Sequence, residues 1–287
     1  MTHVVLFPGQ GSQVKGMGGG LFDRFPDMTA EADRILGYSI GELCLEDPRG
    51  ELGLTQFTQP ALFVVNALLY RARMEDDGAA PDFAAGHSLG EYNALLAAGC
   101  FDFATGVTLV KERGALMGRV SGGGMSAVIG LEPETIQTVL QESEEGRRVD
   151  VANFNSFEQT VMAGPKEDLA AVAPALDAAG ARMVVPLKVS APFHSRYMRD
   201  AQREFEGFLR GFEFHAPSIP VISNVRARPY DADRVRATLA EQIGNSVRWL
   251  ESMLYLMETP EPAFEEVGPG QVLTKLLKQI QKRQAQR

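Results

Sequence analysis

The chain has 287 residues, of which 45% are hydrophobic and 23% charged, so it can bury a large core. Its net charge of −9 argues against a nucleic-acid-binding protein, which would carry a basic surface. The cysteines, Cys44 and Cys100, form no disulfide framework or metal-binding cluster. Without a signal segment or an apolar run of about 18 residues, we expect a soluble, cytoplasmic protein that binds no metal and no membrane.

Strands and helices alternate through the first 122 residues. An apolar run at 4–7 predicts a buried strand, and Pro60 is expected to open a helix, because proline is tolerated in a first helical turn. Gly99 is expected to end one helix and Asp102 to cap the next. The other predicted elements here are helices at 21–36, 61–74, 91–98 and 103–120 and a strand at 83–85. This alternation indicates an α/β fold with a mainly parallel sheet.

A glycine cluster at 121–124 indicates a flexible joint, after which the order of the predicted elements changes. The next elements are expected to be strand 125–130, helix 132–143, strand 149–153, strand 159–163, helix 166–179 and strand 182–189. This βαββαβ order is ferredoxin-like. We therefore expect a ferredoxin-like small domain at 123–190, inserted into a large α/β-hydrolase-like domain at 1–122 and 191–287. That domain resumes with helices near 196–210, 234–243 and 247–257 and strands at 220–223 and 264–267.

The segment Gly86-His87-Ser88-Leu89-Gly90 fits the nucleophile-elbow pattern G-x-S-x-G. Small residues on both sides of the serine allow a tight turn from strand to helix. Such a turn lifts Ser88 Oγ out of the sheet at a helix amino terminus, where a backbone N–H can face an oxyanion. The pattern is short, so an ordinary strand-to-helix turn is the alternative.

A nucleophilic serine needs a base, and the chain has four histidines. His3 begins the first strand, His87 adjoins the serine, and His215 lies in a segment typical of a loop. His194 lies at the exit from the inserted domain, where a cleft is expected. Elimination favours His194 as the base, and a structural role for it stays open.

Arg113 lies on the apolar face of helix 103–120, about 60° from Val110 and about 40° from Met117. Because burying an unpaired arginine is costly, we expect an anionic partner. Two interpretations are open. Arg113 either forms a structural ion pair or snorkels to the surface, or it clamps a substrate carboxylate through two parallel hydrogen bonds.

Several longer motifs follow one another in the chain: Phe7-Pro8-Gly9-Gln10-Gly11-Ser12-Gln13, Thr58-Gln59-Pro60-Ala61, Gly86-His87-Ser88-Leu89-Gly90-Glu91-Tyr92, Arg113-Gly114, Asn153-Phe154-Asn155-Ser156, Phe193-His194-Ser195 and Glu266-Val267-Gly268-Pro269-Gly270. Together they resemble the malonyl-CoA:acyl-carrier-protein transacylase family. The resemblance covers essentially the whole chain. It implies a serine acyltransferase that moves a malonyl group from malonyl-CoA to an acyl carrier protein and needs no cofactor.

The resemblance also implies residue roles. Ser88 would be the nucleophile and His194 the general base, oriented by the backbone carbonyl of Gln242 rather than by an aspartate. The backbone N–H groups of Gln10 and Leu89 would form the oxyanion hole. Arg113 would bind the malonyl carboxylate.

Phe193 resembles the residue found before the histidine in malonyl-selective members of the family, where a bulky ring fills the space for an α-methyl group. The segments 36–40, 56–62 and 190–198 look most like freestanding acyltransferases that serve polyketide synthases, such as the disorazole type. A housekeeping fatty-acid transacylase is the alternative.

Two rival functions remain for comparison. A hydrolase could use the same elbow, but hydrolase relatives within the family tend to lose the arginine that Arg113 matches. A docking module with a dead site would not need Ser88 and His194. For the carrier-protein partner, which is typically acidic, we expect a basic docking surface at Arg196 and Arg199.

Overall fold

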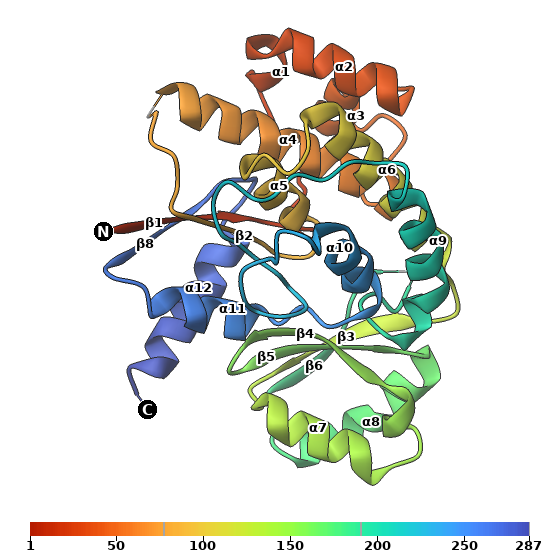
Figure 1. Cartoon of the computed structure of the whole chain (residues 1–287). Helices are drawn as coiled ribbons and strands as arrows, with labels where there is room; N and C mark the ends of the chain where they lie inside the picture. The colour runs from red at the N-terminus through yellow and green to blue at the C-terminus, as the bar shows by residue number, and fades with distance from the viewer. Residues whose placement is uncertain (77, 190, 287) are drawn as a thin grey trace.

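The computed structural model describes residues 1–76, 78–189 and 191–286 and contains two separate sheets, seen in Figure 1. The first is a parallel sheet in the order β7-β2-β1-β8. Its strands are β1 (Thr2–Phe7), β2 (Phe83–Gly86), β7 (Val221–Ile222) and β8 (Pro262–Glu266). The predicted strands near 4–7, 83–85, 220–223 and 264–267 are thus confirmed, within a few residues at their ends.

Both faces of the parallel sheet are covered, and β1 shows how its sequence achieves this. Side chains alternate between the faces of a strand. Val5 and Phe7 pack into one apolar cluster with α4 (Thr55–Asp76), α5 (Gly90–Ala97) and α6 (Phe103–Arg119). Val4 and Leu6 pack into another with α11 (Trp249–Met257) and α12 (Val272–Gln284). An unbroken apolar run is therefore required in a strand that is buried on both sides.

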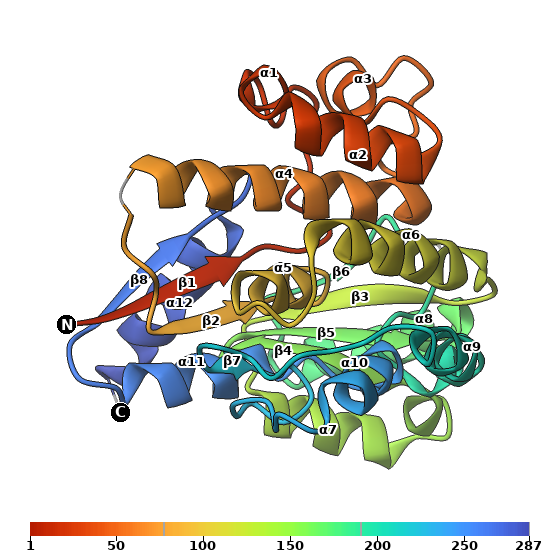
Figure 2. The ribbon, with the colours of Figure 1, turned by 45° about the horizontal axis from the view of Figure 1, so that its top comes forward.

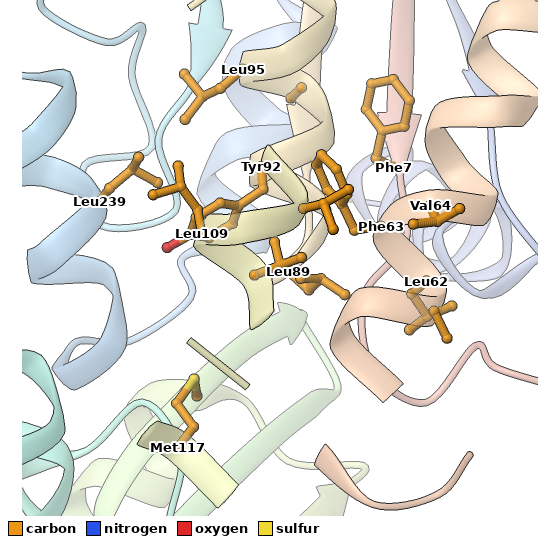
Figure 3. Packing of buried hydrophobic residues seen from close by; sticks show 14 of the residues in the cluster. Phe7, Leu62, Phe63, Val64, Leu89, Tyr92, Leu95, Leu109, Met117 and Leu239 are labelled. Carbon is orange, nitrogen blue, oxygen red and sulfur yellow. The ribbon is translucent and has the colours of Figure 1, made fainter. Parts of the chain in front are cut away.

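The first cluster surrounds the helix that follows the serine. Figure 3 shows Leu89, Tyr92 and Leu95 among side chains from α4 and α6 such as Phe63 and Leu109. Figure 2 shows α4 between the sheet and an outer group of helices. These are α1 (Leu21–Arg24), α2 (Pro26–Leu36) and α3 (Ile40–Leu45).

Two of the predicted helix limits in this part are wrong. The helix expected at 21–36 is interrupted at Phe25, because Pro26 starts a new helix at its first position, where a missing N–H costs nothing. Pro60 opens no helix and instead lies inside α4, which begins at Thr55. The prediction of the capped helix is confirmed, since Asp102 accepts a hydrogen bond from the Thr105 N–H at the start of α6.

The second sheet is antiparallel, in the order β4-β5-β3-β6. Its strands are β3 (Gly124–Ile129), β4 (Asp150–Ser156), β5 (Gln159–Gly164) and β6 (Met183–Pro186), and a 3₁₀ turn, η1 (Gly146–Arg148), precedes β4. The helices α7 (Pro133–Glu142) and α8 (Lys166–Ala178) cover one face, at the bottom of Figure 1. This confirms the ferredoxin-like βαββαβ arrangement. The last strand is shorter than the predicted 182–189.

Backbone hydrogen bonds join the second sheet to the rest of the chain. A parallel bridge pairs Asn153 of β4 with Val247. Val247 N–H donates to the Ala152 carbonyl at 2.8 Å, and its own carbonyl accepts from the Phe154 N–H at 2.9 Å. Before Val247 comes α10 (Val235–Gly244), and before that η2 (Arg196–Met198) and α9 (Arg199–Leu209). The domain limits at 122/123 and 190/191 stay a prediction, and Ser190 lies outside the described residues.

Candidate active site

The turn that carries Ser88 has the geometry of a nucleophile elbow, and its glycines are required sterically. Ser88 has a φ of 51°, in the left-handed region that non-glycine residues rarely adopt. A Cβ on Gly90 would lie 2.0 Å from the Phe7 carbonyl oxygen, and one on Gly86 would lie 1.9 Å from the Gly90 carbonyl carbon. Only glycine allows β1, β2 and α5 to approach this closely at the turn.

Two side chains stabilise the strained backbone of Ser88. The Ser88 N–H donates to Asn224 Oδ1 at 2.7 Å, and the Ser88 carbonyl accepts from Gln242 Nε2 at 2.8 Å. The amide of Asn224 also donates to the Gly86 carbonyl at 2.7 Å. These bonds tie both ends of the elbow to elements far along the chain, which offsets the cost of the positive φ.

Ser88 and His194, 106 residues apart, are in contact. Ser88 Oγ lies 2.7 Å from His194 Nε2, and His194 Nδ1 lies 2.9 Å from the Gln242 carbonyl oxygen. A carbonyl can only accept, so Nδ1 carries the proton and Nε2 is free to accept from the serine hydroxyl. Burial, together with the charge of Arg113, lowers the pKa of His194 to about 3. The imidazole is therefore neutral and can act as a base near neutral pH.

Arg113 is 1% exposed and points at the same serine. Nη1 donates to Gln59 Oε1 at 2.8 Å, and Nη2 donates to Gln242 Oε1 at 2.9 Å and to Ser88 Oγ at 3.2 Å. The guanidinium also lies over the Tyr92 ring. Of the two interpretations, the structural ion pair and the snorkelling side chain find no support, because Arg113 is buried and its hydrogen bonds to described residues all go to neutral oxygens. The carboxylate clamp stays a prediction. This cation has neutral partners and can accept an anionic ligand.

The backbone N–H groups of Gln10 and Leu89 are both available. Among the described residues, neither donates a hydrogen bond. The loop after β1 lies against the elbow, since a Cβ on Gly9 would be 3.4 Å from the Leu89 nitrogen. Two free donors beside the serine are what an oxyanion hole requires, although that role stays a prediction.

A cavity of about 230 Å³ joins these groups. One side is polar, with Gln10, Gln59, Ser88, Arg113 and His194. The other side is apolar and comes largely from the antiparallel sheet and its flanks, with Met125, Ala127, Val161, Leu187 and Val189. Phe193 lines the same cavity, next to the histidine. The site therefore lies between the two sheets.

The two residues predicted to dock the carrier protein lie in different environments. A second cavity, of about 630 Å³, is lined by both Arg196 and Arg199 and by His194. Arg196 is already engaged, because its side chain forms an ion pair with Asp150 and its N–H donates to the same carboxylate at 2.7 Å. Arg199 is exposed and forms no ion pair with any described residue. Arg199 is thus the better candidate of the two.

The hydrogen-bond partners of two polar residues beside the serine were not predicted from the sequence. Glu91, which is fully buried, accepts hydrogen bonds from Tyr230 and Gln242. His87, the neighbour of the serine, points away from it and pairs through Nε2 with Asn155 Oδ1 at 2.8 Å. The one sequence signal was the position of Glu91 in a largely apolar helix, where a buried acid needs donors.

Neither a metal-binding cluster nor a membrane-spanning helix occurs among the described residues. No group of three or more His, Cys, Asp or Glu side chains there is arranged to hold a metal ion. No helix within the described ranges is long and apolar enough to cross a membrane.

Comparison with known proteins agrees with this geometry. The family model of the acyl transferase domain matches residues 4–286. The chain is 54% identical over 278 residues to the polyketide biosynthesis malonyl CoA-acyl carrier protein transacylase PksC of Bacillus subtilis, covering 96% of each chain. It is 53% identical to the polyketide biosynthesis protein ThaF of Burkholderia thailandensis. That match covers 97% of the chain and 24% of ThaF.

The malonyl CoA-acyl carrier protein transacylase of Escherichia coli K12 is 41% identical to the chain, over 96% of the chain and 91% of that protein. Among solved structures, the malonyl CoA-acyl carrier protein transacylase of Burkholderia pseudomallei superposes with a TM-score of 0.95 at 50% identity, covering 99% of each chain. A malonyl-transacylase solved in complex with a type II polyketide synthase acyl-carrier protein gives 0.92 at 40% identity, over 98% of this chain and 93% of that one. The chain therefore belongs to the acyl transferase domain family and, within it, to the malonyl CoA-acyl carrier protein transacylases.

Proposed function

We propose that the protein transfers a malonyl group from malonyl-CoA to the phosphopantetheine thiol of an acyl carrier protein, through an ester on Ser88. One observation carries this proposal. Within a single cavity, Ser88 Oγ lies 2.7 Å from the base nitrogen of His194 and 3.2 Å from Nη2 of Arg113. A nucleophile, its base and a buried cation for a carboxylate are thus within reach of one short acyl group.

In the first half-reaction, Ser88 Oγ attacks the thioester carbonyl carbon of malonyl-CoA while His194 Nε2 takes the hydroxyl proton. The N–H groups of Gln10 and Leu89 stabilise the developing oxyanion. When the C–S bond breaks, the proton on His194 passes to the departing sulfur. The products are coenzyme A and a malonyl-serine ester, and the malonyl carboxylate lies on Arg113.

In the second half-reaction, the carrier-protein thiol attacks the ester carbonyl and gives its proton to His194. The tetrahedral intermediate collapses, the bond to Ser88 Oγ breaks, and His194 returns the proton to the serine. The His194 imidazole accepts and donates the proton in every step, and the Gln242 carbonyl fixes its tautomer. None of these steps requires a metal or redox group.

We further infer that the protein supplies a polyketide synthase. The relatives named for polyketide biosynthesis are 52–54% identical to the chain, whereas the Escherichia coli transacylase is 41% identical. A housekeeping role therefore fits less well. Phe193 would exclude acyl groups with an α-methyl substituent, since its ring lines the acyl cavity. Both cysteines, Cys44 and Cys100, are free and buried, which suits the reducing cytoplasm in which we place the reaction.

The test is incubation with malonyl-CoA followed by intact-protein mass spectrometry. The wild-type protein should gain one malonyl group and lose it to a carrier protein that bears phosphopantetheine, but not to the apo form. Ser88→Ala should gain none. Ser252→Ala, which removes a buried serine hydroxyl on α11, is the matched control and should behave as wild type. Release of free malonate without transfer would indicate a hydrolase and refute the proposal.

A further inference from the structure

Glu91 is a buried acid that forms no ion pair with any cationic side chain in the described part of the chain. It is 0% exposed and lies three residues after Ser88, in the first turn of α5. One carboxylate oxygen accepts from the Tyr230 hydroxyl and the other from Gln242 Nε2 at 2.6 Å, and both lie 3.3 Å from the Asn224 nitrogen. A carboxylate is costly to bury, so this arrangement needs an explanation beyond packing.

Gln242 connects this acid to every reacting group. Its backbone carbonyl accepts from His194, as described above. Its side-chain Nε2 donates both to Glu91 and to the Ser88 carbonyl, and its Oε1 accepts from Arg113 Nη2. Because two acceptors face Nε2, the amide oxygen must face the guanidinium. Glu91 and the Ser88 carbonyl therefore orient the amide from one side, and Arg113 contacts its oxygen on the other.

We propose that Glu91 is a positioning residue for malonyl recognition: it fixes the amide of Gln242, which in turn holds Arg113 in place for the substrate carboxylate. This inference rests on the proposed function. Glu91 acts through Gln242 and does not itself touch the substrate.

The amide between the two charges has a specific advantage. A carboxylate placed directly on Arg113 would compete with the malonyl carboxylate for the same guanidinium N–H groups. Gln242 instead offers a neutral acceptor that positions the guanidinium and leaves its charge available. The carboxylate of Glu91 lies on the other side of Gln242 from Arg113. Burial lowers the pKa of the Arg113 guanidinium, and the negative charge of Glu91 opposes that lowering and so favours the charged form. Burial raises the pKa of Glu91 to about 7, although its hydrogen bonds and Arg113 favour the ionised form.

The proposal predicts a selective defect. Without the carboxylate, Gln242 Nε2 keeps only the Ser88 carbonyl as an acceptor, so the amide is held less firmly and Arg113 loses a well-fixed acceptor. Acetyl-CoA has no carboxylate for Arg113 to bind, so its transfer does not need the guanidinium as a clamp. Loss of Glu91 should therefore reduce malonyl transfer more than acetyl transfer, whereas general destabilisation would reduce both alike.

The experiment measures kcat/KM for ester formation on Ser88 with malonyl-CoA and with acetyl-CoA. In Glu91→Gln, which preserves side-chain volume, the malonyl-to-acetyl ratio should fall about tenfold. Gln242→Met removes the amide but keeps the backbone carbonyl on His194, and its ratio should fall by a similar factor. The double variant should show no further fall, because both changes interrupt one connection. Tyr230→Phe removes a donor from the other carboxylate oxygen, leaves the Gln242 contact, and should keep the wild-type ratio.

An unchanged ratio in either Glu91→Gln or Gln242→Met would overturn the inference, as would a double variant whose loss is the product of the two single losses. Gln242→Met serves as the test if Glu91→Gln does not fold. A wild-type protein that forms no malonyl ester would instead refute the proposed function, before any variant is compared.

Discussion

Nη2 of Arg113 donates a hydrogen bond to Oγ of Ser88 at 3.2 Å, so the cation is in direct contact with the proposed nucleophile. A malonyl group has one methylene between its carboxylate and its thioester carbonyl. A clamp for that carboxylate must consequently lie beside the nucleophile, and a more distant arginine could not bind the acyl group in a position for attack. The contact also places a positive charge beside the serine oxygen, which gives up its proton as it attacks.

Arg113→Ala should lose malonyl transfer and gain relative activity towards acetyl-CoA. Loss of the charge-assisted contact should cost about 2–4 kcal/mol, or roughly 30- to 1000-fold in kcat/KM for malonyl-CoA. Arg119→Ala is the control on the same helix, since Arg119 is exposed and pairs with Glu204. The measurement is ester formation with each acyl-CoA. Equal losses for both donors would mean that Arg113 only supports the fold.

The pH dependence of ester formation should lack the ordinary histidine inflection. Because the pKa of His194 is lowered to about 3, the imidazole stays neutral, and kcat/KM for acetyl-CoA should be flat from about pH 8 down to about pH 5. The charge of Arg113 contributes to this lowering, so Arg113→Ala should raise the pKa and move the acid limb upward. Acetyl-CoA is the substrate for this comparison. A wild-type inflection near pH 6.5 would contradict the assignment.

The nucleophile elbow should not tolerate a methyl group at Gly90. Its Cβ would lie 2.0 Å from the Phe7 carbonyl oxygen, so strand β1 and helix α5 would have to separate. We expect Gly90→Ala to cost about 3 kcal/mol of unfolding free energy, measured by chemical denaturation. Gly207→Ala on α9 is the contrasting change, because a Cβ there meets nothing within 4 Å. It should stabilise the helix by about 0.5–1 kcal/mol.

Docking of an acidic carrier protein should depend on Arg199 more than on Arg196, which is paired with Asp150. Arg199→Glu should raise the KM for carrier protein several-fold and leave ester formation from malonyl-CoA unchanged. Added salt should reduce the difference by screening. Arg210→Glu, at the far end of the same helix and exposed, is the control. If Arg199→Glu impairs ester formation instead, the residue serves coenzyme A or the fold.

Much of the architecture could be predicted from the sequence, because local signals determine it. Asp102 caps α6 and Gly99 ends α5 with a φ of 72°, both as expected from residue type. Pro60 misled the prediction for a physical reason. Proline is compatible with a helix start, but tertiary packing buries Pro60 inside α4, which outweighs the hydrogen bond that it cannot make.

In the candidate site, too, local features could be predicted from the sequence and long-range contacts could not. Ser88 lies in a local motif, and its turn could be predicted. The contacts of Gln242 with Glu91 and with Arg113 join residues 151 and 129 positions apart. No periodicity or short pattern encodes such distances, which are set by how α5, α6 and α10 pack. The sequence therefore indicated Arg113 as a residue needing a partner, but not that its partners would be amides.

The backbone pairing of Asn153 with Val247 determines which segments can be exchanged between relatives. Val247 follows Gln242 in the segment that fixes the imidazole, so β4 supports the base from across the chain. A chimera that replaces only residues 123–190 would pair a foreign strand with the native Val247 segment. Functional chimeras should inherit 242–249 and the antiparallel sheet from one parent. For recombination, these two separated segments form a single unit.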